Sequence, residues 1–141
     1  MKKIKIVGER RTGRSTMLIN SMFVHLIDDT LKEDLVMIAS ASNAMGRQQL
    51  NNGLVEKLSS SKINFSASIN KIEVNGRTCL FLPPDPRSFI GIKFDYVFLD
   101  NVEFFDSRFI DFIDTIIRPN VIVVQTHEEK SLFFKEVPHK D

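Results

Sequence analysis

A short strand that runs directly into a glycine-flanked polar loop constrains the fold of this chain more than any other feature. Residues 2–7 are typical of a β-strand, and the sequence that follows them is Gly8-Glu9-Arg10-Arg11-Thr12-Gly13-Arg14-Ser15-Thr16. This is the phosphate-binding pattern G-x-x-x-x-G-K-[ST] with arginine in place of the lysine. The loop is followed by an apolar helical pattern at Met17, Leu18, Met22, Phe23 and Leu26. Loop N–H groups and the positive end of a helix favour bound phosphate, so the sequence predicts a nucleotide site here.

The loop supplies most of the candidate ligands. We expect ATP phosphates to be bound by Gly8, Arg10, Arg11, Thr12, Gly13, Arg14, Ser15 and Thr16. The Ser15 hydroxyl is a natural Mg²⁺ ligand, although serine at this place is also a common helix N-cap. Arg14 keeps the positive charge of the missing lysine, but its planar guanidinium changes the geometry for γ-phosphate transfer. Arg10 or Arg11 is expected to contact the γ-phosphate, the other being a surface charge.

Composition predicts one domain over residues 1–141, with a core at 2–126 and a C-terminal helix and tail at 127–141. The formal net charge of +1 gives no general attraction to DNA or membranes, so a nucleic-acid partner would need a local patch. The single cysteine, Cys79, excludes an internal disulfide and fits a reducing cytoplasm, which would be the host's if the protein is viral. No apolar run has the length of a membrane span or the form of a signal peptide.

The middle of the chain alternates between strand and helix patterns. Leu35–Ala39 is a continuous apolar run of strand length. Ser42 or Asn43 would cap a helix that extends to about Leu58, with an apolar side formed by Met45, Leu50, Leu54, Val55 and Leu58. Two strands, Ile63–Val74 and Thr78–Leu82, flank Asn75-Gly76, which is a strong hairpin signal.

The last third repeats the alternation. Tyr96–Leu99 predicts a buried strand that ends on Asp100, and a helix is expected from about Val102 to Ile117, with an inner stripe at Phe105, Phe109, Phe112, Ile113 and Ile116. Val121–Val124 is the last predicted core strand and ends at Gln125-Thr126. The pattern indicates an α/β fold with a mostly parallel central sheet covered on both faces. Ligands bind beyond the carboxyl ends of such strands, where the loop, Asp100 and Gln125-Thr126 should converge.

Asp100 follows four apolar residues, which is the form of a Walker B aspartate that holds Mg²⁺. The alternative is a carboxylate that caps the next helix. Many ATPases place glutamate directly after this aspartate to activate water, but here the residue is Asn101, whose amide orients water without accepting its proton. Glu103 is a second candidate for that role, although an acid in the first turn of a helix is also favoured by the helix dipole.

A family resemblance is carried by two segments. Residues 89–100, with Gly91-Ile92-Lys93-Phe94-Asp95-Tyr96-Val97-Phe98-Leu99-Asp100, and the loop Arg10-Arg11-Thr12-Gly13-Arg14-Ser15-Thr16 resemble the ATPase domain of phage large terminases, the DNA-packaging motors related to superfamily 2 helicases. The resemblance covers about residues 4–126 and implies a three-layer P-loop NTPase fold of the RecA/terminase type. It implies that the loop binds ATP, that Ser15 and Asp100 hold Mg²⁺, and that Arg10 or Arg11 is a cis arginine. Gln125-Thr126 would be the coupling motif that senses the γ-phosphate.

The chain departs from that family at Arg14, at Asn101, and in lacking an adenine-clamping segment before its first strand or a nuclease acid cluster after Thr126. Three classes of function therefore stay open. They are a weak ATPase of a DNA-packaging type, a nucleotide-binding structural or regulatory subunit that does not hydrolyse ATP, and a nucleoside or nucleotide kinase. Because thymidine kinases of similar loop sequence carry a cysteine-bound zinc, the single cysteine argues against the last class.

Partners are predicted in outline. A DNA contact is expected through Arg47, Gln48 and Lys57, for which a solvated helix face is the alternative. A motor would form a homo-oligomer or assemble with phage packaging or replication proteins. The three histidines, His25, His127 and His139, show no metal-ligand spacing.

Overall fold

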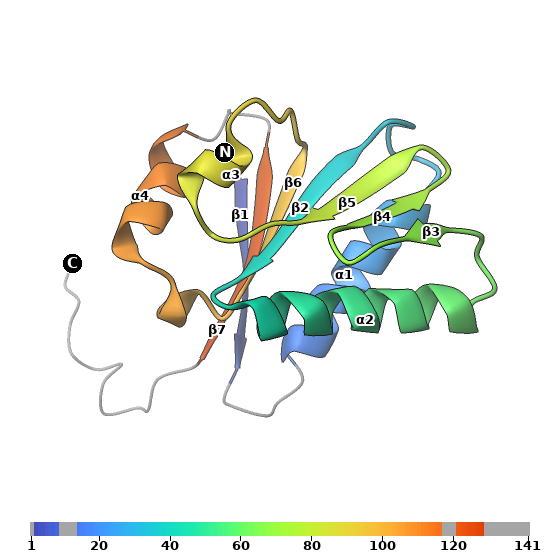
Figure 1. The fold of residues 1–141 in the computed structure, drawn as a ribbon, viewed down its shortest axis with the longest axis horizontal. Helices are drawn as coiled ribbons and strands as arrows, with labels where there is room; N and C mark the ends of the chain where they lie inside the picture. The colour runs from blue at the N-terminus through green and yellow to red at the C-terminus, as the bar shows by residue number, and fades with distance from the viewer. Residues whose placement is uncertain (1, 9–13, 117–120, 129–141) are drawn as a thin grey trace.

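The structure is a computed structural model that describes residues 2–8, 14–116 and 121–128. The strands are β1 (Lys2–Gly8), β2 (Val36–Ala41), β3 (Ser66–Ala67), β4 (Lys71–Val74), β5 (Arg77–Phe81), β6 (Tyr96–Asp100) and β7 (Ile122–Glu128). The helices are α1 (Arg14–Ile27), α2 (Ala44–Ser60), α3 (Pro86–Phe89), the 3₁₀ turn η1 (Val102–Phe104) and α4 (Ser107–Ile116). They form three layers, with helices on both faces of one sheet (Figure 1).

The sheet has seven strands in the order β1-β7-β6-β2-β5-β4-β3. The first five of these strands are parallel to one another, and β4 and β3 continue the sheet in antiparallel orientation. The prediction of a mostly parallel α/β sheet with one hairpin is confirmed. The order places β7, the last strand in sequence, between the strand that precedes the phosphate loop and the strand that ends on Asp100.

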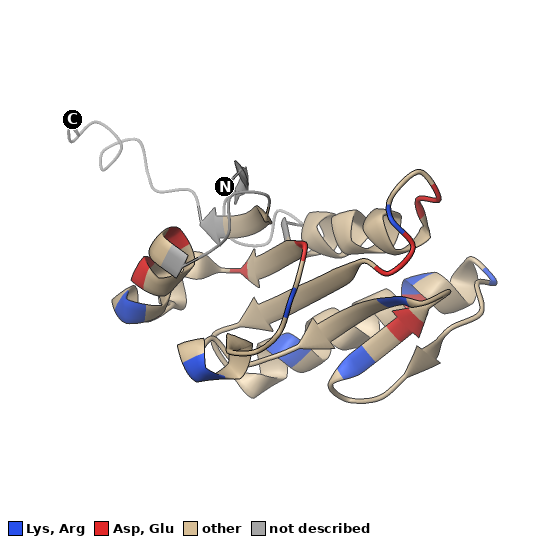
Figure 2. Cartoon of the chain, turned by 90° about the horizontal axis from the view of Figure 1, so that it is seen from above, with Lys and Arg blue, Asp and Glu red and all other residues tan. Residues whose placement is uncertain are grey.

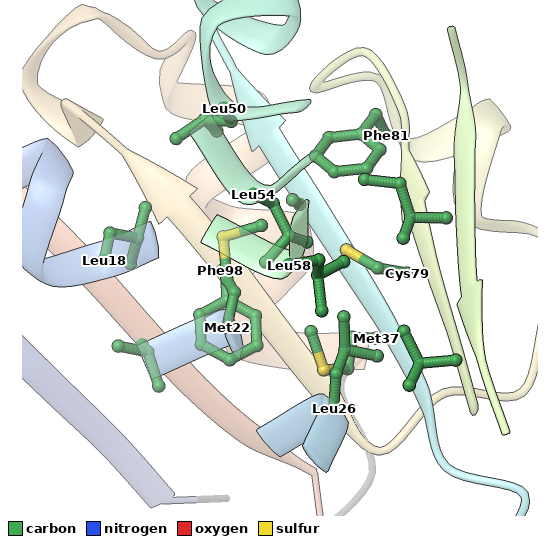
Figure 3. Close-up of a cluster of buried hydrophobic side chains, with 14 of the residues drawn as sticks. Leu18, Met22, Leu26, Met37, Leu50, Leu54, Leu58, Cys79, Phe81 and Phe98 are labelled. Atoms are coloured by element: carbon green, nitrogen blue, oxygen red, sulfur yellow. The ribbon is translucent and has the colours of Figure 1, made fainter. Parts of the chain in front are cut away.

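Strand residues alternate between two cores, one on each face of the sheet. Met37, Ala39, Phe98 and Val124 pack with α1 and α2, whereas Ile38, Val97, Leu99 and Val123 pack with α3, η1 and α4. Figure 3 shows how α1 and α2 contribute leucine and methionine side chains to the first core, opposite Phe98, Cys79 and Phe81. Because this period of two is regular, it also determines which polar side chains at the strand ends face α1.

The hairpin turn is confirmed, but its first strand is shorter than predicted. Asn75 and Gly76 have φ values of 50° and 85°, as a two-residue turn of type I′ requires. In place of a strand over residues 63–74, the chain bends between β3 and β4, where the Ser68 N–H bonds to the Lys71 carbonyl. The Asn51 amide of α2 donates to the carbonyls of Ser68 and Ile69 in this bend. The Asn51 side chain thus supplies the hydrogen bonds that a neighbouring strand would otherwise make to this backbone.

The predicted helix over residues 102–117 is wrong in its first turns. The chain forms η1 and then interrupts at Phe105-Asp106 before α4 begins. Asp106 Oδ1 accepts a hydrogen bond from the Arg108 N–H at 2.8 Å, which satisfies a free donor at the start of α4. Phe105 still packs in the second core with Phe109 and Ile113, so the apolar stripe was predicted correctly where the helix was not.

Asn43 caps α2 through its side chain, which accepts from the Gly46 N–H at 2.8 Å. Met45, expected on the apolar side of this helix, lies in its first turn and is instead 71% exposed. The predicted C-terminal helix and tail fall outside the described residues, apart from the end of β7. Within the described ranges no helix has the length and apolar character needed to cross a bilayer.

Candidate nucleotide site

The carboxyl ends of the central parallel strands meet at one edge of the sheet. In the register of the strands, Asp100 pairs with Ala41 on one side and Leu99 pairs with Gln125 on the other, while Gly8 pairs with Glu128. The ends of β1, β6 and β7 therefore lie next to one another. α1 begins at this same edge, because it follows β1 after the loop (Figure 1).

The face of the sheet on which each polar side chain lies follows from the alternation. Phe98 and Val124 belong to the core under α1 and α2, and two residues further along the same strands are Asp100 and Thr126. Both side chains thus point to the face that α1 covers. Ser15 lies in the first turn of α1, directly above them.

The three side chains are joined by hydrogen bonds. The Ser15 hydroxyl donates to Asp100 Oδ2 at 2.8 Å, and the Thr126 hydroxyl donates to Asp100 Oδ1 at 2.6 Å. Thr126 Oγ1 in turn accepts the Asn101 N–H at 2.8 Å. Asp100 is 5% exposed and Thr126 is fully buried. We refer to Ser15, Asp100 and Thr126 as the hydroxyl–carboxylate cluster.

The cluster has the chemistry of a divalent-cation site. A carboxylate and a serine hydroxyl are hard oxygen donors, which Mg²⁺ prefers, and Mg²⁺ usually takes only one or two protein ligands beside water and phosphate oxygens. The two hydroxyls are neutral, so they solvate the Asp100 carboxylate without neutralising its charge. Asp100 Oδ2 and Ser15 Oγ are therefore the atoms that would hold the ion.

Asn101 leaves β6 in an unusual conformation. Its φ and ψ are 57° and 60°, in the left-handed region that asparagine tolerates better than most residues. Its side-chain oxygen Oδ1 is buried and has no hydrogen-bond partner, the one such side-chain atom in the part of the chain that the structure describes. The backbone N–H of Asn101 is thus fixed by Thr126, while its side-chain oxygen has no donor among the described residues.

The structure describes the other predicted site residues to different extents. Arg10, Arg11, Thr12 and Gly13 lie outside the described residues, and Gly8 and Arg14 are described by their backbones at the end of β1 and the start of α1. Their binding roles stay predictions. Thr16 is exposed in the first turn of α1, and Glu103 is exposed in η1.

Gln125 and Thr126 are separated by the alternation of β7. Gln125 pairs with Leu99 and follows Val123 on the face of α4, whereas Thr126 is on the face of Asp100. The structure therefore brings Thr126 to the cluster and does not bring Gln125 there. Val124 is buried against α1, and residues two positions apart in a strand lie on the same face of the sheet. The sequence signal that selects Thr126 is therefore its position two residues after Val124.

The three side chains predicted to contact DNA all have partners within the chain. Arg47 Nη1 donates to the Ala41 carbonyl at 2.9 Å, Gln48 donates to Asn52 Oδ1 at 2.8 Å, and Lys57 Nζ lies 5.3 Å from the centre of the Phe23 ring. Lysines and arginines are spread over several elements (Figure 2). DNA binding stays a prediction from sequence.

Comparison with known proteins identifies the fold. No protein-family model matches the sequence, and no curated protein sequence matches it. Among solved structures, the large terminase of bacteriophage HK97 aligns over 90% of this chain with a TM-score of 0.73 and 14% identity. This chain has a terminase-like fold. The large terminase ATPase domain of Thermus phage P74-26 aligns over 96% of the chain with a TM-score of 0.69 and 12% identity.

A third terminase-like structure contains a nucleotide analogue. This large terminase, from another thermophilic bacteriophage and solved in complex with ATP-γ-S, aligns over 89% of this chain with a TM-score of 0.65 and 15% identity. The chain spans 29% of the HK97 terminase, 62% of the P74-26 domain and 32% of the terminase solved with ATP-γ-S. At these identities the likeness shows the fold, which is the terminase-like fold expected from the sequence.

Proposed function

We propose that this chain is a terminase-like nucleotide-binding domain that binds ATP with Mg²⁺ and hydrolyses it slowly on its own. The observation that carries the proposal is the 2.8 Å hydrogen bond between Ser15 and Asp100, two residues that are 85 positions apart in sequence. The phosphate-loop serine and the strand-end aspartate are the pair that holds Mg²⁺ in P-loop NTPases. A phage terminase that shares the fold was solved with ATP-γ-S, which supports the choice of nucleotide.

The residues of this chain have separate roles in the proposal. Ser15 and Asp100 would hold the ion, which would offset the negative charge of the phosphates. The loop from Gly8 to Thr16 surrounds the phosphates, with Arg14 as the cation in place of lysine and Arg10 or Arg11 on the γ-phosphate. Gln125 and Glu103 remain candidates for contacts with the ligand.

Slow hydrolysis follows from two substitutions. Arg14 retains charge but not the compact geometry of an ammonium group. Asn101 is placed directly after the Asp100 carboxylate, where a glutamate would accept a proton from the attacking water. The second candidate function, a nucleotide-binding structural or regulatory subunit without turnover, is favoured by the same Asn101. A DNA partner, a homo-oligomer or a packaging complex is proposed only for the case in which the chain is part of a DNA-packaging motor.

The test is calorimetric titration of the purified chain with ATP in the presence of Mg²⁺. Asp100→Asn and Ser15→Ala should each weaken ATP binding about tenfold or more, since a charge-assisted contact contributes roughly 1.5–3 kcal/mol. Matched controls are Asp111→Asn, an exposed aspartate on α4, and Ser15→Thr, which keeps the hydroxyl. Both controls should bind ATP as the wild type does.

Phosphate release in the same samples separates the two candidate functions. Slow release that disappears in Asp100→Asn would establish a weak ATPase. Binding without release would establish the non-hydrolysing subunit. Absence of ATP binding in the wild type, or equal binding by Asp100→Asn and Asp111→Asn, would contradict the proposal.

A further inference from the structure

A hollow of about 440 Å³ lies where α2 begins, beside the bend between β3 and β4. Two of the three most exposed large apolar side chains in the described part of the chain line it, Met45 at 71% and Ile69 at 67% exposed. Phe81, buried at the end of β5, also contributes to the lining. The polar lining comes from Arg47, Gln48 and Asn70. Exposed apolar side chains gathered around a concavity are typical of interaction sites, and we call this one the α2–bend hollow.

The walls of the α2–bend hollow are held by hydrogen bonds. The Asn51 amide of α2 donates to the carbonyls of Ser68 and Ile69 at 3.0 and 3.3 Å. The Phe81 N–H donates to the Asn70 carbonyl at 2.8 Å. These bonds tie the bend both to α2 and to β5, so a partner would not have to order this segment, which lowers the cost of binding.

Arg47 is the cation of the hollow, and it lies on the side of β2 away from Asp100. The Leu82 N–H donates to the Ala39 carbonyl at 3.1 Å, so that carbonyl points toward the β5 side of β2. Ala41 lies two residues further along β2, so its carbonyl points the same way. Arg47 Nη1 donates to this carbonyl at 2.9 Å. The guanidinium is therefore near the ends of β2 and β5, apart from the hydroxyl–carboxylate cluster.

The half-buried Arg47 guanidinium has spare donors and no ionic partner. Arginine presents five N–H donors, and the contact with a backbone carbonyl uses one of them. Among the described residues, no carboxylate forms an ion pair with Arg47. The arginines of the hollow beside α3 and α4 differ, since each pairs with its own aspartate, Arg87 with Asp85 at 3.0 Å and Arg108 with Asp106 at 3.6 Å. The charge of Arg47 thus favours an anionic partner.

We propose that the α2–bend hollow binds an extended segment of a partner protein in which an aromatic or apolar residue stands next to a carboxylate. The carboxylate accepts hydrogen bonds from Arg47, and the apolar side chain lies between Met45 and Ile69. Arginine, methionine and aromatic residues are enriched in protein–protein interfaces. Nucleic acid suits the hollow less well, because its phosphates are usually neutralised by several cations, and Arg47 is the one lysine or arginine among the described lining residues.

A small probe with both groups tests the proposal. N-acetyl-phenylalanine joins one aromatic ring to one carboxylate, and it can be titrated into the isotope-labelled full chain and followed by NMR. It should shift the amide signals of residues 44–48 and 69–70 with a dissociation constant of about 1 mM, as expected for a ligand of this size. N-acetyl-phenylalanine amide, which lacks the charge, should bind at least about fivefold more weakly.

Variants assign the two halves of the probe. Arg47→Gln should abolish the difference between the acid and the amide, and Met45→Ala should weaken binding of both at least about threefold. The matched controls are Arg108→Gln, at a side chain that is 89% exposed on α4, and Met17→Ala, at a side chain that is 52% exposed on α1. Both controls should bind the probe as the wild type does.

Three results would overturn the proposal. One is equal binding of the acid and the amide by the wild type, or no shift of these signals with about 10 mM of the acid. Another is an equal loss of affinity in Arg47→Gln and Arg108→Gln. The third is a larger shift of the same signals by thymidine monophosphate than by N-acetyl-phenylalanine at equal concentration, which would indicate a nucleic-acid site in place of a protein-binding one.

Discussion

The Thr126 hydroxyl uses both of its hydrogen-bonding functions within the cluster. It donates to Asp100 Oδ1 and accepts from the Asn101 N–H, and the residue is fully buried. One side chain on β7 therefore fixes both the carboxylate at the end of β6 and the left-handed turn after it. Since the hydroxyl is engaged in this way, we interpret Thr126 as a residue that positions Asp100.

Replacing Thr126 tests this position at the scale of single atoms. Thr126→Val keeps the shape but leaves the Asp100 oxygen and the Asn101 N–H without partners, so the free energy of unfolding should fall by about 2–4 kcal/mol. Thr126→Ser retains the hydroxyl and loses one methyl group, which should cost only about 1 kcal/mol. Urea unfolding measures both. Equal losses in the two variants would mean that the hydroxyl contributes little.

At the scale of elements, the buried cation Arg77 closes the end of α1. It is 6% exposed at the start of β5, and its guanidinium donates to the carbonyls of Leu26 at 3.3 Å, Leu31 at 2.7 Å and Lys32 at 3.0 Å. Carbonyls at a helix C-terminus lack partners within the helix and favour a positive charge. Arg77 thus joins α1 and the segment after it to the sheet, on the edge opposite the nucleotide site.

Removing this guanidinium should destabilise the protein strongly. Arg77→Met keeps an apolar stem but leaves the carbonyls of Leu26, Leu31 and Lys32 without this donor, so we expect a loss of about 2–4 kcal/mol in the free energy of unfolding. Arg108→Met is the matched control, because the Arg108 side chain is 89% exposed, and it should change stability by less than about 0.5 kcal/mol. Chemical denaturation followed by circular dichroism compares them; similar losses would contradict a structural role for Arg77.

At the scale of the whole molecule, both faces of the sheet are covered by apolar side chains, and Cys79 lies fully buried in the first of the two cores (Figure 3). Burial raises the pKa of the Cys79 thiol far above its ordinary value. The thiol is therefore protonated in the folded protein at any pH at which the fold survives, whereas it ionises in the unfolded chain above about pH 8.5.

This difference makes global stability depend on alkaline pH. Above the pKa of the unfolded thiol the unfolded state binds fewer protons than the folded state, so the free energy of unfolding falls as pH rises. Between about pH 8 and about pH 10 the decrease due to Cys79 should be about 1.5–2 kcal/mol. Urea unfolding of the wild type and of Cys79→Ala at both values isolates it, because other groups titrate alike in the two proteins. Parallel pH dependences would show that the thiol does not contribute.

Local patterns determined the elements of this protein and most of their order. The apolar runs Leu35–Ala39 and Tyr96–Leu99 predicted strands because continuous apolar segments of that length are typical of strands buried on both faces. Asn75-Gly76 predicted the hairpin turn because both positions adopt positive φ. The pairing of Ser15 with Asp100 was predictable too, because carboxyl ends of parallel strands share an edge and the loop begins the adjacent helix.

Tertiary structure decided what depends on neighbours distant in sequence. The sheet order places β7 beside β6 and so brings the end of β7 to Asp100, where the alternation of the strand then selects Thr126 over Gln125. Arg77 found its carbonyl partners only when β5 packed near the end of α1. The left-handed turn at Asn101 likewise depends on a hydrogen bond with β7. Sequence patterns carry local preference and period, whereas the partner of each buried polar group is determined by which strands become adjacent.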